Sequence, residues 1–471
     1  MTIAYAIAWI TPLAFGSAIV ALLQGRLRAG HALAQTAGYG FMLGALACSI
    51  GVALLGRIDV ARVVPALAPA LLALALGGWV WAWLRADTGG IAAQRSRIHP
   101  LLWLLLVLLA ARAALMIDEI LLRPMYPWDA WAAWLMKPKA WMLGGHVDRF
   151  VPFAEWLMDA GGTLRTAQAW NYPEMIGRLA VWFSSAWGEW NAGVVGAIWL
   201  AVWVALLAGV YGQLRALGLD SSRALVATYA LGSLPLINVH VALAGYADLW
   251  IATVLAFACL SWMRWLATRE WGHLALAALF AISLPMIKLE GGVWLVVFGG
   301  SVLYERMPPR LRRIALGAAP LIGAGVIAAY LLRWPVIAPL LDRIGLTADI
   351  DLLADHAPDV ISATVQGLFA QYNWHLLWFA VALTLVLRFD ALRRSPALRV
   401  FGLFLVLGCA FLFALFVLTP AGKWAESFTA VNRLSLQIVP SMLAFAALLW
   451  RRDAAAQVEP ARMADAVPAG P

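Results

Sequence analysis

Residues 100–121 have the sequence PLLWLLLVLLAARAALMIDEIL. The stretch is long enough to cross the hydrocarbon core of a bilayer as a helix, and Arg112 is its only charge before Asp118. Windows of about 19 residues with this character recur along the chain. They predict an all-α polytopic membrane protein with about thirteen transmembrane helices. We expect these helices near residues 3–23, 37–55, 65–84, 99–121, 191–211, 223–238, 247–266, 273–287, 291–304, 314–332, 374–388, 399–418 and 434–450.

The composition of the whole chain excludes a soluble globular protein. Of the 471 residues, 63% are hydrophobic and 13% are charged, and the mean hydropathy is +0.82. Long apolar runs favour helices over a membrane β-barrel, whose strands alternate in polarity. The three cysteines, Cys48, Cys259 and Cys409, lie inside apolar runs, so a disulfide framework is not expected.

The charges lie between the predicted spans and indicate an orientation. Most of the 34 Lys and Arg residues fall on one set of alternating connections and on the C-terminal tail. The positive-inside rule places that side in the cytoplasm, so we expect a bacterial inner-membrane protein with a periplasmic N-terminus and a cytoplasmic C-terminus. Since membrane topology accounts for the net charge of +9, no nucleic-acid partner is predicted. The carboxylates gather on the outer side, which suits a site of chemistry or the solvated loops of a transporter.

Loop lengths suggest three regions. Residues 1–98 form an N-terminal extension of three membrane helices, and 99–450 form the main transmembrane module. Within that module, about 122–190 form a long periplasmic loop and about 333–373 a second outer stretch. Residues 451–471 are rich in Ala and Pro without an apolar pattern, so a disordered cytoplasmic tail is expected.

The start of the first outer loop carries acidic and aromatic residues. Asp118 and Glu119 lie at the lipid boundary, and prolines then break the helix. From Trp128 onward, apolar and aromatic residues including Trp131 recur every three or four positions, which predicts a helix lying along the membrane surface. Asp129 and Lys137 lie off its aromatic face and are expected to face one cavity.

The aromatic residues of this loop have two interpretations. Trp and Tyr are enriched at membrane interfaces, where they act as anchors. The chain has 26 Trp residues, however, and indole faces also hold sugar rings and prenyl chains.

A second interfacial helix is predicted over residues 170–182, with Tyr172 and the following proline at its start. Glu174 and Arg178 are four residues apart on it. They can pair with each other, or Arg178 can contact a substrate.

Three more polar groups end predicted spans on the same side. Asp248 opens a span, where the helix dipole favours an acidic residue. Lys288 and Glu290 lie between two spans, and they form either a hairpin pair or, for Lys288, a phosphate contact. Arg433 precedes the last span, and its guanidinium either snorkels to the interface or binds phosphate. No Gly-rich phosphate loop, serine nucleophile motif or His/Cys metal set is present, so no metal site is predicted.

Short motifs in residues 99–450 resemble those of bacterial integral-membrane glycosyltransferases of the GT-C fold. This group contains protein O-mannosyltransferases, aminoarabinose transferases of lipid A and sugar transferases of the rhizobial lipopolysaccharide core. The motifs that carry the resemblance are YPWDAWAAW (126–134), NYPE (171–174), YAD (246–248), KLEG (288–291) and RLSLQ (433–437).

The resemblance implies inverting transfer of a sugar from a polyprenyl-phosphate donor to a glycan, lipid or protein acceptor at the periplasmic face. Asp129 resembles the family's catalytic aspartate, and Asp118 with Glu119 is the competing assignment. The resemblance places Lys288 and Arg433 at the donor phosphate, and Arg178 is a further candidate there. The other candidates for substrate contact are Lys137, Asp248, Glu290, Tyr172, Trp128 and Trp131.

No cofactor is expected with certainty, and a divalent cation is left open. Two other functions remain as alternatives. A flippase for lipid-linked sugars would need a polar path through the spans, and an O-antigen polymerase or ligase would use the same carrier lipid.

Overall fold

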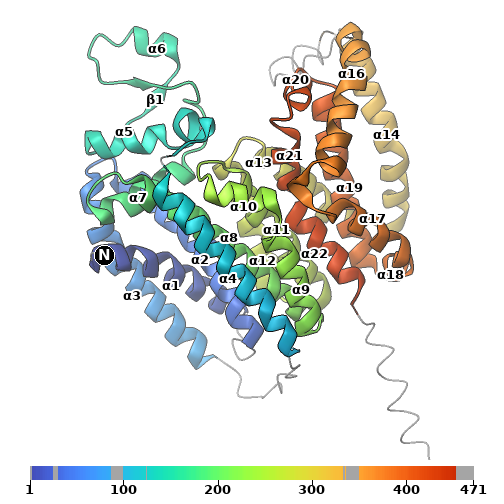
Figure 1. The fold of residues 1–471 in the computed structure, drawn as a ribbon, viewed down its shortest axis with the longest axis horizontal. Coiled ribbons are helices and arrows are strands. Elements are labelled where there is room, and N and C mark those ends of the chain that lie inside the picture. Colours follow the sequence, from blue (N-terminus) through green and yellow to red (C-terminus); the bar gives the residue numbers. More distant parts are fainter. Residues whose placement is uncertain are drawn as a thin grey trace, which may run out of the picture.

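The computed structural model describes residues 3–24, 30–85, 99–123, 125–332, 335 and 350–451. Most of these residues are helical (Figure 1). The only strands in the described ranges are β1 (Phe150–Val151) and β2 (Arg165–Thr166), which pair in parallel over two residues. The all-α prediction is therefore confirmed.

Seven helices of the described part are long and apolar enough to cross a membrane, and these make the chain a multi-pass membrane protein. They are α1 (Ile3–Gln24), α2 (Gly30–Leu55), α3 (Val63–Leu84), α4 (Trp103–Leu122), α8 (Ala192–Ala216), α11 (Asp248–Thr268) and α19 (Pro396–Val417). An eighth span is possible in α9 (Ser221–Gly232) with α10 (Pro235–Ala242), which bend by 59° where Pro235 begins the second helix. The predicted count of thirteen is not confirmed.

Several of the remaining predicted spans correspond to shorter apolar helices. Three of them are α12 (Trp271–Ile287), α17 (Leu377–Leu387) and α22 (Val439–Leu449). The last begins with a proline at its first turn, and Pro285 lies in the last turn of α12. Proline has no backbone N–H donor, so it interrupts the helical hydrogen-bond pattern close to the polar turns that flank these helices. The turns carry residues of the candidate site.

Side-chain caps explain where several helices begin. Asn191 accepts a hydrogen bond from the Val194 backbone N at 3.1 Å and starts α8. Asp220 accepts a hydrogen bond from the Arg223 backbone N at 2.9 Å and starts α9, and the Ser395 side chain caps the start of α19. Such caps satisfy backbone donors that have no partner within the helix.

The core is centred on α11, nearly all of whose residues are buried. Helices α1 and α2 pack against each other and against α7 (Met175–Trp187) (Figure 1). Their crossing is close, because a Cβ on Gly44 would lie 1.8 Å from the Pro12 carbonyl oxygen. The first two helices are thus built into the core, and the division at residue 98 stays a prediction.

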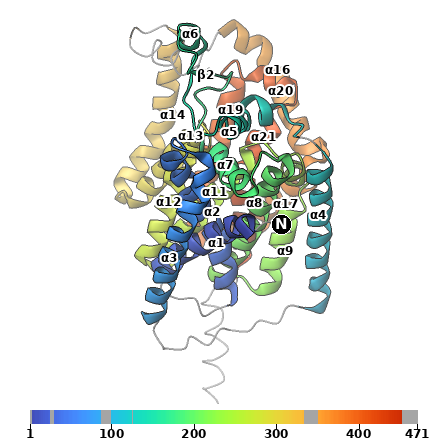
Figure 2. The same ribbon diagram turned by 90° about the vertical axis from the view of Figure 1, so that its left-hand side faces the viewer.

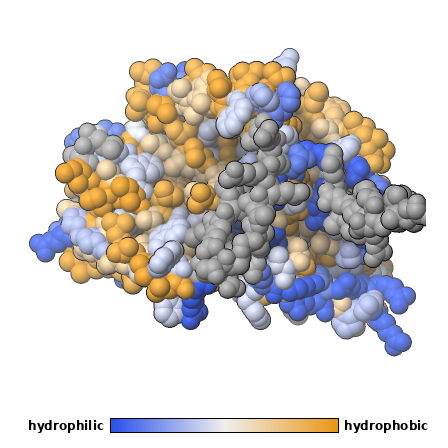
Figure 3. All heavy atoms as spheres, turned by 90° about the horizontal axis from the view of Figure 1, so that it is seen from below, coloured by the Kyte–Doolittle hydropathy of each residue, from blue (hydrophilic) through white to orange (hydrophobic). Residues whose placement is uncertain are grey.

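Helices α3 and α4 lie at the periphery of the bundle (Figure 2). Both expose large apolar side chains, including Trp83 and Leu104. Figure 3 shows hydrophobic side chains over much of the surface seen from below. This exposure is expected where lipid is the solvent.

The predicted first outer loop forms a small subdomain at one end of the bundle (Figure 1). It contains η3 (Ala130–Trp134), α5 (Met136–Gly144), β1, α6 (Phe153–Leu157) and β2. The prediction of one continuous helix from Trp128 is wrong, because the π-helical turn η3 ends at Leu135 before α5 begins. The second predicted helix, α7, starts only at Met175. It is largely buried against α1, α2 and α8 and does not lie on the surface.

The C-terminal part of the bundle surrounds α19 and α22. Its elements are α13 (Gly291–Arg306), α14 (Pro309–Leu331), α16 (Ile350–Val365), η4 (Gln366–Ala370), η5 (Tyr372–Trp374), α18 (Phe389–Arg394), α20 (Gly422–Glu426) and α21 (Val431–Leu436). Two short turns, η1 (Val60–Arg62) and η2 (Pro100–Leu102), precede α3 and α4. Of the predicted second outer stretch, 333–334 and 336–349 lie outside the described residues, and so do 452–471 of the predicted tail.

Candidate functional site

Five charged residues from four parts of the chain meet at the end of the bundle that carries the η3–β2 subdomain. We call this group the Asp248 cluster; its members are Asp129, Asp248, Lys288, Glu290 and Arg433. They come from the turn before η3, the start of α11, the connection between α12 and α13, and α21.

Asp248 is the centre of the cluster, and its exposed fraction is 0%. Its Oδ1 accepts hydrogen bonds from Lys288 Nζ and Gln437 Nε2, both at 2.8 Å. Its Oδ2 accepts from Arg433 Nε at 3.2 Å and from Arg433 Nη2 at 3.1 Å. These bonds offset the cost of burying the carboxylate. The position of Asp248 is therefore explained by these side chains in addition to the dipole of α11.

Arg433 joins Asp248 to Asp129, because its Nη2 also donates to Asp129 Oδ2. The ring of Tyr246 lies 4.2 Å from the guanidinium carbon, in cation–π contact. Arg433 thus points into the protein and does not snorkel to the interface. Its partners raise the pKa of the guanidinium although burial lowers it.

A glycine allows the Asp129 segment to reach α11. Gly245 has φ +129°, and a Cβ at this position would lie 2.2 Å from the Ala130 Cβ. A larger residue would push Asp129 away from the start of α11.

Lys288 bonds to two carboxylates. Its Nζ lies 2.8 Å from Asp248 Oδ1 and 3.1 Å from Glu290 Oε1. The predicted Lys288–Glu290 pair is therefore present, but it is not self-contained. Burial disfavours the ammonium, yet the two carboxylates outweigh it and raise the pKa of Lys288 to about 12.

A second group, the Lys137 cluster, consists of Lys137, Glu174 and Arg178. Lys137 is buried, and its Nζ donates to the carbonyl oxygens of Trp170 at 2.7 Å and Tyr172 at 3.1 Å. Glu174 Oε1 lies 3.7 Å from that nitrogen, and Glu174 Oε2 lies 2.5 Å from Arg178 Nη2. The predicted Glu174–Arg178 pair is present. Burial lowers the pKa of Lys137, although Glu174 opposes the shift. Lys137 thus holds the loop before α7, and its shared cavity with Asp129 stays a prediction.

The other candidate residues differ in position. Tyr172 lies between the two clusters, since its carbonyl accepts from Lys137 and the charges of the Asp248 cluster act on its hydroxyl. Trp128 and Trp131 are exposed beside Asp129, and their ring centroids lie 4.4 Å apart in an edge-to-face arrangement.

The competing candidates, Asp118 and Glu119, lie on α4. Asp118 is exposed, and Glu119 pairs with Arg123. No contact joins either residue to the Asp248 cluster in the described structure.

Gln437 is the main site residue that was not among the candidates. It is fully buried, and besides its bond to Asp248 it accepts a hydrogen bond from Trp294 Nε1 at 2.5 Å. The available signal was a polar amide at the start of an apolar run, inside the RLSLQ motif. Within the described ranges, no group of three His, Cys, Asp or Glu residues is placed to hold a metal ion.

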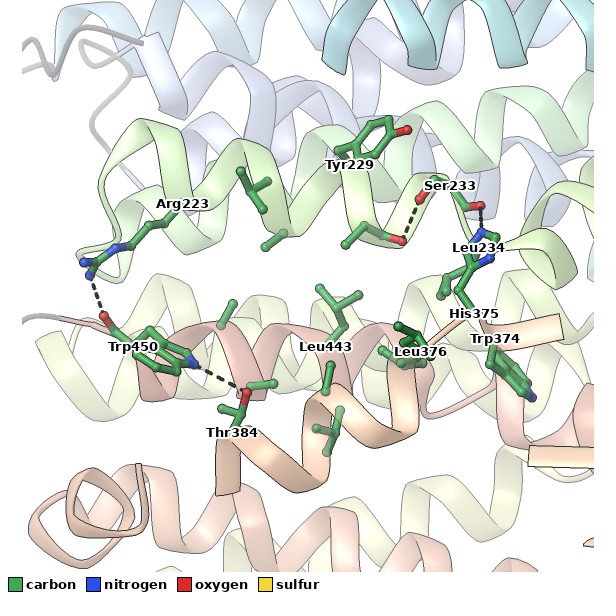
Figure 4. Close-up of a pocket in the computed structure, with 18 of the residues that line it drawn as sticks. Arg223, Tyr229, Ser233, Leu234, Trp374, His375, Leu376, Thr384, Leu443 and Trp450 are labelled. Atoms are coloured by element: carbon green, nitrogen blue, oxygen red, sulfur yellow. Dashed lines mark hydrogen bonds between the residues drawn. The ribbon is translucent and has the colours of Figure 1, made fainter. Parts of the chain in front are cut away.

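A largely apolar groove of about 660 Å³ runs between α9, α17 and α22 (Figure 4). Trp374 and His375 lie at one end, and Arg223 and Trp450 lie at the other. The indole of Trp374 donates to Asn432 Oδ1 at 2.8 Å, and Asn432 directly precedes Arg433. The groove therefore ends next to the helix that supplies Arg433.

Comparison with known proteins identifies no relative. No protein-family model, curated protein or solved structure matches the chain.

Proposed function

We propose that this protein is an inverting glycosyltransferase that moves a sugar from a polyprenyl-phosphate donor to a hydroxyl of a glycan, lipid or protein acceptor. The site faces the periplasm of a bacterial inner membrane. The observation that carries the proposal is the joining of Asp129, through Arg433, to Asp248 and Lys288. This arrangement puts a partly exposed carboxylate beside two held cations at the end of a membrane bundle.

The two cations suit the phosphate of the donor. Lys288 and Arg433 bond to the two oxygens of one buried carboxylate, so they are held side by side. At an effective dielectric constant of 20, a cation 4 Å from a phosphate charge contributes on the order of 4 kcal/mol. The planar fork of Arg433 also matches phosphate oxygens. Their charge stabilises the phosphate as a leaving group.

Asp129 is the proposed general base. It takes the proton of the acceptor hydroxyl while the hydroxyl oxygen forms a bond to C1 of the sugar. The bond between C1 and the phosphate oxygen breaks, and its electron pair leaves with the polyprenyl phosphate. Attack from the face opposite the phosphate inverts C1, so no covalent enzyme intermediate is needed.

The groove suits the apolar chain of the donor. Its walls are mainly Leu, Ala and Val side chains, and it adjoins α21 through the Trp374–Asn432 hydrogen bond. A chain lying in it would extend from the phosphate position into the membrane part of the bundle. The exposed Trp128 and Trp131 offer apolar faces for a sugar ring beside Asp129.

Transfer of a radiolabelled sugar from prenyl-phosphate donors, measured with the purified protein in detergent, tests the proposal. We expect Asp129→Asn to lower the transfer rate by about 100- to 10,000-fold, because the base is lost. Asp118→Asn is the matched control and should keep full activity. A longer prenyl chain should lower the KM of the donor.

Other outcomes would redirect the assignment. Full activity in Asp129→Asn would move the base to Asp118 or Glu119. Movement of labelled donor across proteoliposome membranes without transfer would indicate a flippase. Transfer of preassembled glycans only would indicate a polymerase or ligase.

A further inference from the structure

The Asp248 cluster contains more negative than positive charge. Asp129, Asp248 and Glu290 are three carboxylates, whereas Lys288 and Arg433 are two cations. A phosphate, which is itself an anion, therefore meets a site whose cations are already paired. Departure of a carboxylate from its cation would remove a competing negative charge and so favour phosphate binding.

The three carboxylates are not equally held. Asp248 is fully buried and accepts four hydrogen bonds from three side chains. The side chains of Asp129 and Glu290 are 28% and 32% exposed, and in the described structure each pairs with a single cation. Since an exposed carboxylate regains hydration when it leaves, Asp129 and Glu290 are the exchangeable members.

If Asp129 and Glu290 both left their cations, the net charge of the remaining cluster would change from negative to positive. Without Asp129 and Glu290, the two cations outnumber the one remaining carboxylate, Asp248. Because Asp248 bonds to both cations, it would keep Lys288 and Arg433 in place while their other donors turn to the phosphate. Asp248 is thus a positioning residue.

We propose that the Asp129–Arg433 ion pair is a lock at the phosphate position, and that the donor phosphate replaces Asp129 at Arg433 and so frees the base. The proposal rests on the glycosyltransferase function. Asp129 is engaged with Arg433 until the donor arrives, so the donor binds before the acceptor hydroxyl can be deprotonated. The lock couples base release to donor binding.

Equilibrium binding of farnesyl phosphate to the full-length protein in detergent tests the lock. We expect Asp129→Asn to bind about three- to tenfold more tightly than wild type, because a competing carboxylate is lost, although the same variant loses transfer. Glu290→Gln should tighten binding in the same way at Lys288. Arg433→Ala should weaken binding.

Two controls isolate charge competition from other effects. Asp129→Glu keeps the competing carboxylate and should bind like wild type, and Asp118→Asn removes a carboxylate outside the cluster and should also bind like wild type. Thermal unfolding of each variant shows that it is folded, and inorganic phosphate in place of farnesyl phosphate separates headgroup from chain binding.

The outcomes distinguish the two levels of the proposal. If Asp129→Asn and Glu290→Gln both bind no more tightly than wild type, the lock is wrong while the phosphate site stands. If farnesyl phosphate binds to neither wild type nor Asp129→Asn, the phosphate site is wrong, and the proposed function fails with it.

Discussion

The Asp248 cluster and the Lys137 cluster use the same residue types for different ends. Each has a buried lysine, an arginine and at least one carboxylate. Lys137 donates to the carbonyl oxygens of Trp170 and Tyr172, which cannot move unless the loop moves. Lys288 bonds to the side chains of Asp248 and Glu290. The hydrogen-bond partners of Lys137 are on the main chain and hold a loop, whereas Glu290, the partly exposed carboxylate beside Lys288, is one of the two that we propose a ligand can replace.

Replacement of the centre of the Asp248 cluster should have the largest effect. Asp248→Ala leaves Lys288 and Arg433 at a buried position without their shared partner. We expect a loss of about 3–5 kcal/mol in the free energy of unfolding and the loss of prenyl-phosphate binding. Thermal unfolding and ligand binding in detergent measure both effects. Wild-type stability in this variant would show that Asp248 does not organise the cluster.

A matched pair of lysine variants tests the contrast directly. Lys288→Met should lower transfer about 100-fold or more, because a phosphate contact is lost. Lys137→Met should lower the free energy of unfolding by about 1–3 kcal/mol, because two carbonyl oxygens lose their donor, but the folded protein should keep its transfer activity. Initial rates corrected for the folded fraction separate the two effects. Equal losses of activity would remove the distinction between the clusters.

The smallest expected effect is the opposite pH dependence of the two lysines. Burial lowers the pKa of Lys137 below its ordinary 10.5, so the unfolded chain binds more protons than the folded protein just below that pH. Its contribution to stability should therefore rise with pH in this window. The pKa of Lys288 is raised from 10.5 to about 12, so its contribution is complete below pH 10.5 and is lost as the pH rises through about 12.

Unfolding temperatures of wild type and the two methionine variants between pH 9 and 12, a range set by these lysine pKa values, measure this difference. The Lys137→Met variant should lack the rise, and Lys288→Met should lack the fall. The same pH profile in all three proteins would contradict both assignments.

Local pattern predicted the features that depend on near neighbours in the chain. The apolar runs predicted an all-helical membrane protein, and the four-residue spacing gave the Glu174–Arg178 pair as one of two alternatives. The Lys288–Glu290 pair was also one of the alternatives left open. By contrast, the periodicity of residues 170–182 predicted a surface helix, and α7 is buried because α1 and α2 cover it.

The sequence by itself determined that this protein is embedded in lipid. The free energy of transferring an apolar helix from water into a membrane depends on the residues of that helix alone. The sequence also placed polar residues at the ends of the runs. Only the tertiary structure decided which of them meet: Asp129 and Arg433 lie 304 positions apart, and Gly245 lets the Asp129 segment reach α11. Lys137 and Lys288 are equally basic in the sequence, but packing gave Lys137 two main-chain carbonyls as its hydrogen-bond acceptors and Lys288 the carboxylate of Asp248. Such partners are set by the approach of distant helices, which no local spacing encodes.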